Sequence, residues 1–161
     1  MKYCGKFRLL VVAGIFCLLL VAPLGAQNAA KLEVLLEKEQ IAWSDAVAFA
    51  LEAADITTPE GKLFAKAEDA FEYALQQTWL PKGAELEGTV KLAGVSKLLM
   101  QAFDLNGGLF YRLGKSPHHS YRELCYKGVI KSWDPDKDLS GQEFLYMISK
   151  ILSIKEETAN E

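Results

Sequence analysis

Three aspartates alternate along one short stretch, and this spacing is typical of calcium-binding loops. Asp134, Asp136 and Asp138 stand at alternate positions in the sequence SWDPDKDLSGQEFL. With Asp134 as position 1 of a calcium loop, oxygen-bearing side chains also fall at positions 7 and 9. Positions 6 and 12, which require glycine and a bidentate acid, hold Leu139 and Leu145. The loop therefore lacks both its sharp turn and its decisive carboxylate.

A structural interpretation accounts for more of these residues. Ser140 followed three positions later by Glu143 is a capping box, which predicts the start of a helix. Asp136 and Asp138 would favour the positive end of that helix, and Leu139 would be an apolar side chain inserted into the core. We expect a helix-capping turn with no metal and no cofactor, and a calcium-dependent module is the alternative.

Other groups with catalytic or ligand chemistry are few. His118 and His119 are adjacent, and neighbouring helical positions point about 100° apart, which suits one metal ion poorly. They are expected to be polar residues facing solvent. Glu123 and Asp134 could form an acid–base pair for glycoside cleavage, but nothing in the sequence sets their separation. We expect a protein that is not an enzyme.

Aromatic residues supply the candidate binding surface. They are Trp79, Phe110, Tyr111, Tyr121, Tyr126, Trp133 and Tyr146. Such rings either pack in a core or line a half-exposed groove that stacks on sugars or binds protein. Trp79 and Trp133 enter loops between expected helices and, with Tyr121, are the preferred contact residues. Arg112 and Arg122 flank the same region and could bind a carboxylate or phosphate, or pair with a nearby acid.

The N-terminus has the pattern of a secretory signal peptide, assigned to residues 1–26. Lys2, Lys6 and Arg8 precede an apolar run at 9–22, which is short for a bilayer span of about 20 residues. The protein is therefore expected to be exported to the periplasm or cell envelope. An uncleaved leader is the alternative, and it would be the only contact with a membrane.

Composition limits the remaining classes. The chain has 161 residues, half of them apolar, which suits one compact domain. Residues 27–161 keep 15 of the 18 basic residues and all 21 acids, so their net charge is 15 − 21 = −6. An acidic protein of this kind disfavours nucleic acid as a partner. Cys125 is the one cysteine beyond the leader, expected to be a buried apolar side chain, with a reactive thiol as the alternative.

Apolar spacing and turn residues predict an all-α fold. Residues 108–115 are apolar without helical spacing and could be extended, and residues 154–161 form a charged tail that should fray. The expected helices cover residues 43–55, 58–78, 88–104, 116–127 and 140–153.

Internal similarity is the strongest signal. A shift of 53 residues places VSKLL at 95–99 on ISKIL at 148–152, and the shift falls to 50 further upstream. A weaker copy lies 45 residues before the middle one, so that Ile41, Leu86 and Leu139 become equivalent. The approximate copies are 35–55, 67–104 and 117–153. Three such units could bury together the apolar stripes that one could not.

This arrangement resembles the S-layer homology domain, a family of three helix-loop-helix repeats about a pseudo-threefold axis. The domain is assigned to residues 27–153. The likeness covers residues 35–153, is strong only over 67–153, and is best in YRELCYKGVIKSWDPDKDLSGQEFLYMISKIL, with its Gly-Val step, Asp-Pro loop and capped helix. The resemblance implies binding to cell-wall polysaccharide or peptidoglycan through a Thr-Arg-Ala-Glu type motif. The matching positions, 140–143 and 87–90, read SGQE and EGTV and lack the arginine.

These observations together predict an exported, non-catalytic module of a bacterial cell envelope. Its partner would be a cell-wall polymer, a glycan or an envelope protein, held in grooves between the repeats. The alternative is a periplasmic scaffold or assembly subunit that binds only other proteins.

Overall fold

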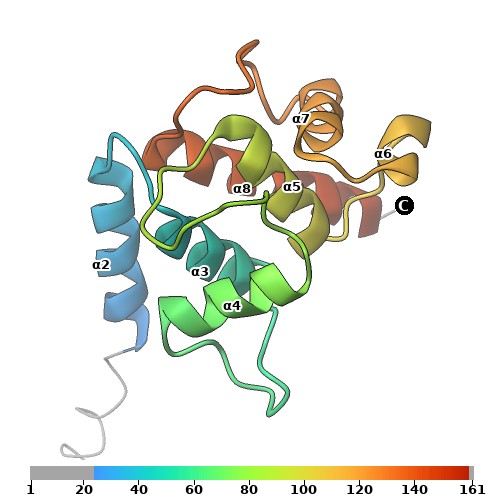
Figure 1. Cartoon of the computed structure of the whole chain (residues 1–161). Helices are drawn as coiled ribbons and strands as arrows, with labels where there is room; N and C mark the ends of the chain where they lie inside the picture. The colour runs from blue at the N-terminus through green and yellow to red at the C-terminus, as the bar shows by residue number, and fades with distance from the viewer. Residues whose placement is uncertain (1–23, 160–161) are drawn as a thin grey trace, which may run out of the picture. The chain divides into compact units, whose positions relative to one another are not determined.

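The computed structural model describes residues 24–159, and this part of the chain is all-α (Figure 1). Its extended pairing is limited to two isolated bridges, Ala42 with Thr89 and Lys91 with Asp138. The helices are α2 (Leu24–Glu37), α3 (Trp43–Ala53), α4 (Ala67–Gln76), α5 (Leu92–Ala102), α6 (Leu109–Leu113), α7 (Pro117–Tyr126) and α8 (Gly141–Ala159).

The chain divides into two compact units, residues 1–34 and 35–161, and the second contains α3 to α8. The expected leader lies outside the described residues, apart from residues 24–26 in the first turn of α2. Within the described range, no helix combines the length and the hydropathy needed to cross a membrane.

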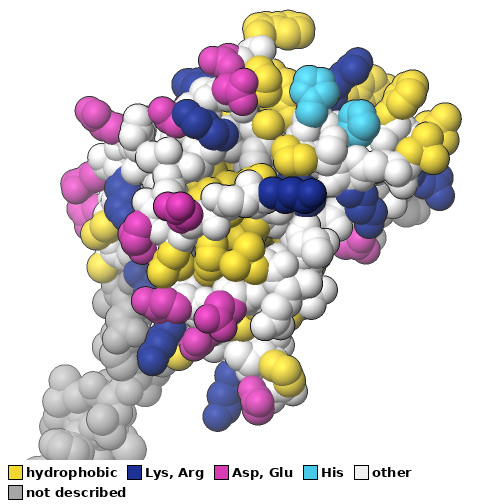
Figure 2. Space-filling model, viewed as in Figure 1, with side chains coloured by type: hydrophobic (Ala, Val, Ile, Leu, Met, Phe, Trp, Pro, Cys, Tyr) yellow, Lys and Arg dark blue, Asp and Glu magenta, His cyan; other side chains and the backbone are white. Residues whose placement is uncertain are grey.

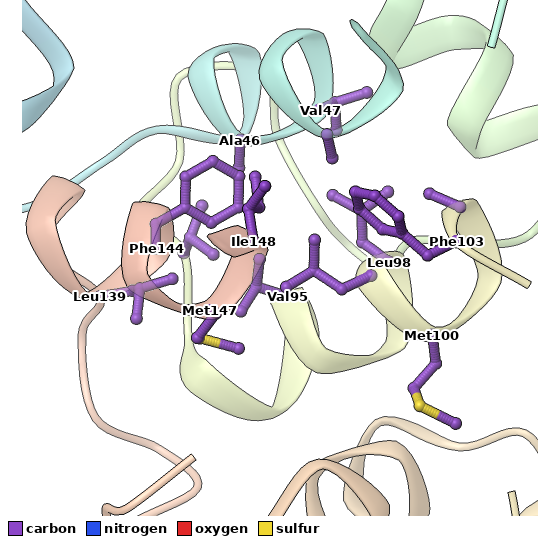
Figure 3. Packing of buried hydrophobic residues seen from close by; sticks show 14 of the residues in the cluster. Ala46, Val47, Val95, Leu98, Met100, Phe103, Leu139, Phe144, Met147 and Ile148 are labelled. Carbon is purple, nitrogen blue, oxygen red and sulfur yellow. The ribbon is translucent and has the colours of Figure 1, made fainter. Parts of the chain in front are cut away.

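The core lies where α3, α5 and α8 meet. Their apolar residues recur at helical spacing, as in Ala46, Val47, Ala50 and Leu51 of α3, so each helix has one buried stripe. Figure 3 shows Val95 and Leu98 of α5 and Phe144, Met147 and Ile148 of α8 meeting the stripe of α3. Helix α4 packs on α3, and α7 packs on α5.

Three main-chain hydrogen bonds close a ring at the centre of this unit. Ile41 N–H donates to the Leu139 carbonyl at 3.0 Å, Leu139 N–H to the Val90 carbonyl at 3.1 Å, and Val90 N–H to the Ile41 carbonyl at 3.1 Å. All three side chains are 1% exposed. The residues are evenly spaced, since 90 − 41 and 139 − 90 both equal 49. Three loops far apart in sequence therefore share one hydrogen-bonded centre.

Helices α3, α5 and α8 each begin two residues after a member of this ring, and a neighbouring loop satisfies the first N–H group of each. The bonds run from Trp43 N to Gly88 O (3.1 Å), from Leu92 N to Lys137 O (3.0 Å) and from Gly141 N to Lys38 O (2.9 Å). The N-cap residues Ala42 and Lys91 form no side-chain cap. At α3 and α5 a main-chain carbonyl of another segment thus satisfies the first N–H group without a side-chain bond from the N-cap residue, whereas Ser140 also caps α8 through its side chain.

Helices α4 and α7 end in the same way, 50 residues apart. Thr78 and Gly128 have positive φ angles of 59° and 72°. The following N–H groups turn back, Trp79 to Ala74 O at 3.0 Å and Val129 to Leu124 O at 2.9 Å. This left-handed ending satisfies late helix carbonyls and turns each chain into the next loop.

The predicted equivalence of Leu86 with Ile41 and Leu139 is wrong. Leu86 is half-buried, and Val90 takes the central place in its stead. The error is four residues, close to one helical turn of 3.6 residues, so the apolar stripe of α5 looks the same in both registers.

Three local predictions also fail. Residues 58–66 are not helical, because Thr58 N–H bonds to Lys62 O at 2.7 Å and Gly61, at a φ of 73°, closes a turn. Residues 109–113 form the short helix α6 rather than an extended segment, and a single turn is too short to show a period. The tail stays helical to Ala159, with Lys155 donating to Phe103 O at 3.2 Å.

Candidate functional site

A groove runs between α8 and the loop before it, and we call it the α8 groove. Its volume is about 280 Å³. Leu92, the first residue of α5, belongs to its apolar floor. Lys131, Lys137, Gln142 and Tyr146 are the exposed residues of its lining. The lining is Leu92, Val129, Ile130, Lys131, Ser132, Lys137, Leu139, Gln142, Glu143, Tyr146 and Met147.

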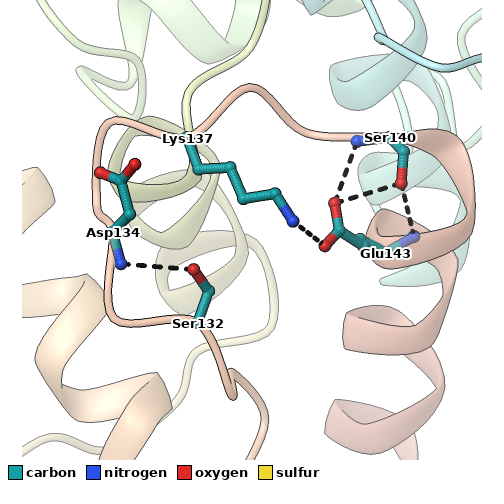
Figure 4. Close-up of polar contacts among 5 residues, drawn as sticks. All are labelled: Ser132, Asp134, Lys137, Ser140 and Glu143. Carbon is teal, nitrogen blue, oxygen red and sulfur yellow. Dashed lines mark hydrogen bonds and ion pairs between the residues drawn. The ribbon is translucent and has the colours of Figure 1, made fainter.

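The capping box predicted at the start of α8 is confirmed and forms one side of the groove (Figure 4). Glu143 N–H donates to Ser140 Oγ at 3.3 Å, and Ser140 N–H donates to Glu143 Oε2 at 3.4 Å. Lys137 adds an ion pair with the same carboxylate. Partial burial raises the pKa of the Glu143 carboxyl, but these hydrogen bonds outweigh burial and leave its pKa below the usual value.

The alternating aspartates serve the turn in separate ways. Asp134 Oδ1 accepts the Asp136 N–H at 3.0 Å, which is a local turn contact. Asp138 pairs with Lys91 Nζ at 2.5 Å and accepts from Gln40 Nε2 at 3.3 Å. Residues 24–159 contain no group of three or more acids, histidines or cysteines that could hold a metal ion. The Asp134 contact is internal to the loop, and the Asp138 contact joins the loop to Lys91 at the start of α5.

Tyr121 of α7 and Trp133 of the loop that follows α7 have different roles. Tyr121 is buried, and its hydroxyl donates to Ser132 O at 2.7 Å, which holds the loop against α7. Trp133, the next residue, is 95% exposed. In Figure 2 a hydrophobic side chain projects at the top, where Figure 1 places the loop between α7 and α8. Tyr121 thus anchors the loop, and Trp133 is available for contact.

Trp79 lies in a different environment after α4. It is half-buried, and its ring meets Tyr73 edge-on at 5.7 Å between centroids. Phe64 also contacts Tyr73, with 5.3 Å between the ring centroids and an angle of 48° between the ring planes. Neither Trp79 nor Trp133 lines the α8 groove. The structure therefore does not gather the two predicted tryptophans into one site.

A second hollow, the α6–α7 hollow, contains Arg122. Its volume is about 500 Å³. Burial raises the pKa of the Tyr111 hydroxyl in its wall, and the hydrogen bond from Gln101 offsets part of that rise. Arg112 is exposed on α6 beside it. The lining is Asn106, Gly107, Gly108, Phe110, Tyr111, His119, Arg122, Glu123, Tyr126 and Lys127.

The predicted pairing of the two arginines with acids is not seen, because neither forms an ion pair in the described part of the chain. Ser116 caps α7 by accepting the His119 main-chain N–H at 3.2 Å, and His119 Nδ1 lies 3.1 Å from Gly114 O. His118 is exposed. Cys125 is half-buried and packs against the core with a free thiol.

Sequence reasoning missed Lys131 and undervalued Tyr146. Lys131 Nζ lies 5.6 Å from the centre of the Tyr146 ring, so a cation and an aromatic face share the mouth of the α8 groove. The sequence did contain an indication of Tyr146, because this aromatic residue stands outside the apolar stripe of α8 that is buried and contains Phe144, Met147 and Ile148. Comparisons of the chain with protein-family models, curated proteins and solved structures found no match.

Proposed function

We propose that residues 35–159 contain three copies of one unit about a pseudo-threefold axis, as in an S-layer homology domain. The proposal rests on the equal 49-residue separation of Ile41, Val90 and Leu139 and on their closed ring of hydrogen bonds. It gains support from the matched endings of α4 and α7. In this register the middle copy is centred on Val90.

We infer further that the protein is an exported, non-catalytic binding module of a cell envelope. The observation that carries this proposal is the α8 groove, whose floor combines Leu92 of the middle copy with residues of the last copy. A groove between copies presents a surface that no single copy has. The export signal in residues 1–26 would deliver that surface to the envelope.

The lining of the groove favours a ligand with an apolar face over a highly charged polymer. Lys137 is neutralised by Glu143, which leaves Lys131 as the cation at the mouth without an ion pair in the described residues. An aromatic ring beside an apolar floor suits the face of a sugar ring or an apolar side chain. We propose peptidoglycan or a wall glycan as the first ligand class.

Retention by isolated cell wall tests this function. The purified protein should sediment with the wall, and Tyr146→Ala should weaken retention about fivefold, the loss expected for one aromatic contact. Leu152→Ala is the matched control, because Leu152 is 39% exposed on the same helix, Tyr146 is 40% exposed, and Leu152 does not line the groove. Equal retention of both variants would exclude the groove as the wall-binding site.

A scaffold that binds only proteins is the second candidate, favoured by the exposed Trp133. An indole this exposed, beside the groove, is typical of residues that anchor protein contacts. Under this function the wall would retain nothing, and a photo-crosslinker at position 132, beside the intact Trp133, would join the protein to an envelope protein in the native cell. Crosslinks from position 132 that survive Trp133→Ala would argue against Trp133 as the anchor.

A further inference from the structure

One segment has a charge opposite to that of the whole chain. Residues 105–131 contain five basic residues and a single acid, Glu123, so their net charge is 5 − 1 = +4, whereas the chain has −3. The basic residues are Arg112, Lys115, Arg122, Lys127 and Lys131. In the described part of the chain none of the five forms an ion pair. This segment therefore carries a net positive charge, with the Glu123 carboxylate as its one acid.

The same region exposes large hydrophobic side chains. Leu109, Phe110 and Leu113 of α6 and Tyr126 at the end of α7 are each more than two-thirds exposed. An apolar group of this size, bordered by polar residues, is typical of a surface that binds a partner or a membrane. Figure 2 shows hydrophobic and basic side chains together at the right-hand edge, where Figure 1 places α6.

The α6–α7 hollow shows that the rings and the cations share one face. Phe110 and Tyr126 line the hollow together with Arg122 and Lys127. Its volume of about 500 Å³ would admit a small polar group such as a phosphate ester. Two cations, Arg122 and Lys127, therefore line a hollow that also contains the Glu123 carboxylate, and exposed apolar side chains stand beside it.

We propose that α6 and the C-terminal end of α7 dock on the surface of a bilayer that contains anionic phospholipid. Leu109, Phe110 and Leu113 enter the boundary between headgroups and acyl chains. Arg112, Lys115, Arg122 and Lys127 contact the phosphate groups. This membrane surface is additional to the α8 groove and does not depend on the function proposed for that groove.

A bilayer fits these features better than a protein partner does. Helix α6 is a single turn, and Leu109, Phe110 and Leu113 are each more than two-thirds exposed, although Phe110 also lines one side of the α6–α7 hollow. A fluid bilayer accepts a projecting apolar group without a matching shape, and it supplies negative charge over a wide area. Each basic residue near an anionic bilayer strengthens binding about fivefold, so four of them contribute substantially.

Hydrogen–deuterium exchange of the full chain, with and without vesicles, tests this proposal. The apolar run at 9–22 can itself attach the chain to any bilayer, so a local signal is needed instead of total binding. With phosphatidylcholine vesicles containing one-quarter phosphatidylglycerol, amides in residues 109–113 should exchange about fivefold more slowly. Pure phosphatidylcholine should give little protection, and 0.5 M salt should remove most of it.

Two paired variants separate the apolar and the basic contributions. Phe110→Ser with Leu113→Ser, and Arg112→Glu with Lys115→Glu, should each abolish the protection of α6. Lys62→Glu with Leu63→Ser is the matched control, because it changes an exposed basic residue and an exposed leucine in a different turn. The control should behave as the wild type.

Three results would overturn the proposal. The first is equal protection by both kinds of vesicle, and the second is protection that survives Arg112→Glu with Lys115→Glu. The third is protection without vesicles that rises with protein concentration, since a second copy of the chain would then cover α6. Failure here is distinguishable from failure of the proposed function, because wall retention is measured through Tyr146 and should be unchanged in the α6 variants.

Discussion

At the scale of single residues, the loop beside the α8 groove is held by contacts at several points. Tyr121 bonds to the carbonyl of Ser132, Asp138 pairs with Lys91, and Glu143 joins Lys137 to the start of α8. A loop held in this way loses little conformational freedom when a ligand binds, so less of the binding free energy is consumed in ordering it. Glu143 is the residue that links loop and helix.

Glu143→Gln should make the stability of the protein less dependent on pH. The folded-state pKa of Glu143 lies below its usual value, 4.5, so its carboxylate stabilises the fold above that pH. That contribution is lost as the pH falls through the lowered pKa. The substitution leaves an amide that can still cap the helix but removes the charge and the ion pair with Lys137, so the free energy of unfolding at pH 7 should fall by about 0.5–1 kcal/mol.

Urea unfolding of both proteins between pH 7 and pH 2.5 checks this expectation. The difference between them should shrink below pH 4.5. Glu72→Gln is the control, because Glu72 is exposed on α4 and should change the free energy of unfolding by no more than about 0.5 kcal/mol. A difference that stays constant with pH would contradict a stabilising role for the ionised carboxylate.

At the scale of elements, the start of α8 is set by a close main-chain approach. Gly141 N–H donates to Lys38 O at 2.9 Å, and a Cβ at position 141 would lie only 1.6 Å from the Leu35 carbonyl oxygen. The corresponding first residues of α3 and α5 are Trp43 and Leu92, which have side chains. Only glycine allows α8 to begin this close to the end of α2.

Gly141→Ala should therefore be strongly destabilising. The added methyl group overlaps main-chain atoms that cannot move as a side chain could, so the cost should be about 3 kcal/mol or more. Gly83→Ala provides the comparison, because it meets no atom within 4 Å and suffers only from its φ of +78°. It should cost about 1 kcal/mol. Thermal unfolding would distinguish the two variants. Equal losses of stability in Gly141→Ala and Gly83→Ala would mean that α8 can shift away from Leu35.

At the scale of the whole unit, three loops are joined by the ring of Ile41, Val90 and Leu139. Each member gives one hydrogen bond to the next and receives one from the third, so removing any loop would leave buried polar groups without partners. This closure makes the three segments depend on one another. We expect residues 35–159 to unfold as one cooperative body.

Val90→Ser and Leu86→Ser test which residue occupies the centre. Val90 is buried, so the substitution leaves a cavity and buries a hydroxyl, with an expected cost of about 3 kcal/mol. Leu86 is half-buried, so Leu86→Ser should lower the free energy of unfolding by only about 1 kcal/mol, although it removes more atoms than Val90→Ser does. The free energy of unfolding in urea decides between them. A larger loss at Leu86 would support the register that sequence similarity alone predicted.

The sequence by itself determined the features that depend on neighbouring residues. Helical spacing predicted the all-α class and the extents of α3 and α7 to within two residues, and the pair Ser140 and Glu143 predicted the start of α8. The meeting of Ile41 with Leu139 was also predictable, because the two residues, 98 positions apart, occupy the same place in the repeated apolar pattern in both the predicted and the observed registers. These features are local, or they repeat in the pattern of apolar residues.

Only the tertiary structure decided the place of Val90, the close approach at Gly141 and the sharing of the α8 groove between α5 and α8. These features arise from main-chain hydrogen bonds between distant loops, and a main-chain group is the same whatever its side chain. A shift of four residues leaves an apolar helical stripe almost in phase, so side-chain patterns cannot choose between the two registers. The closed ring at the centre makes that choice.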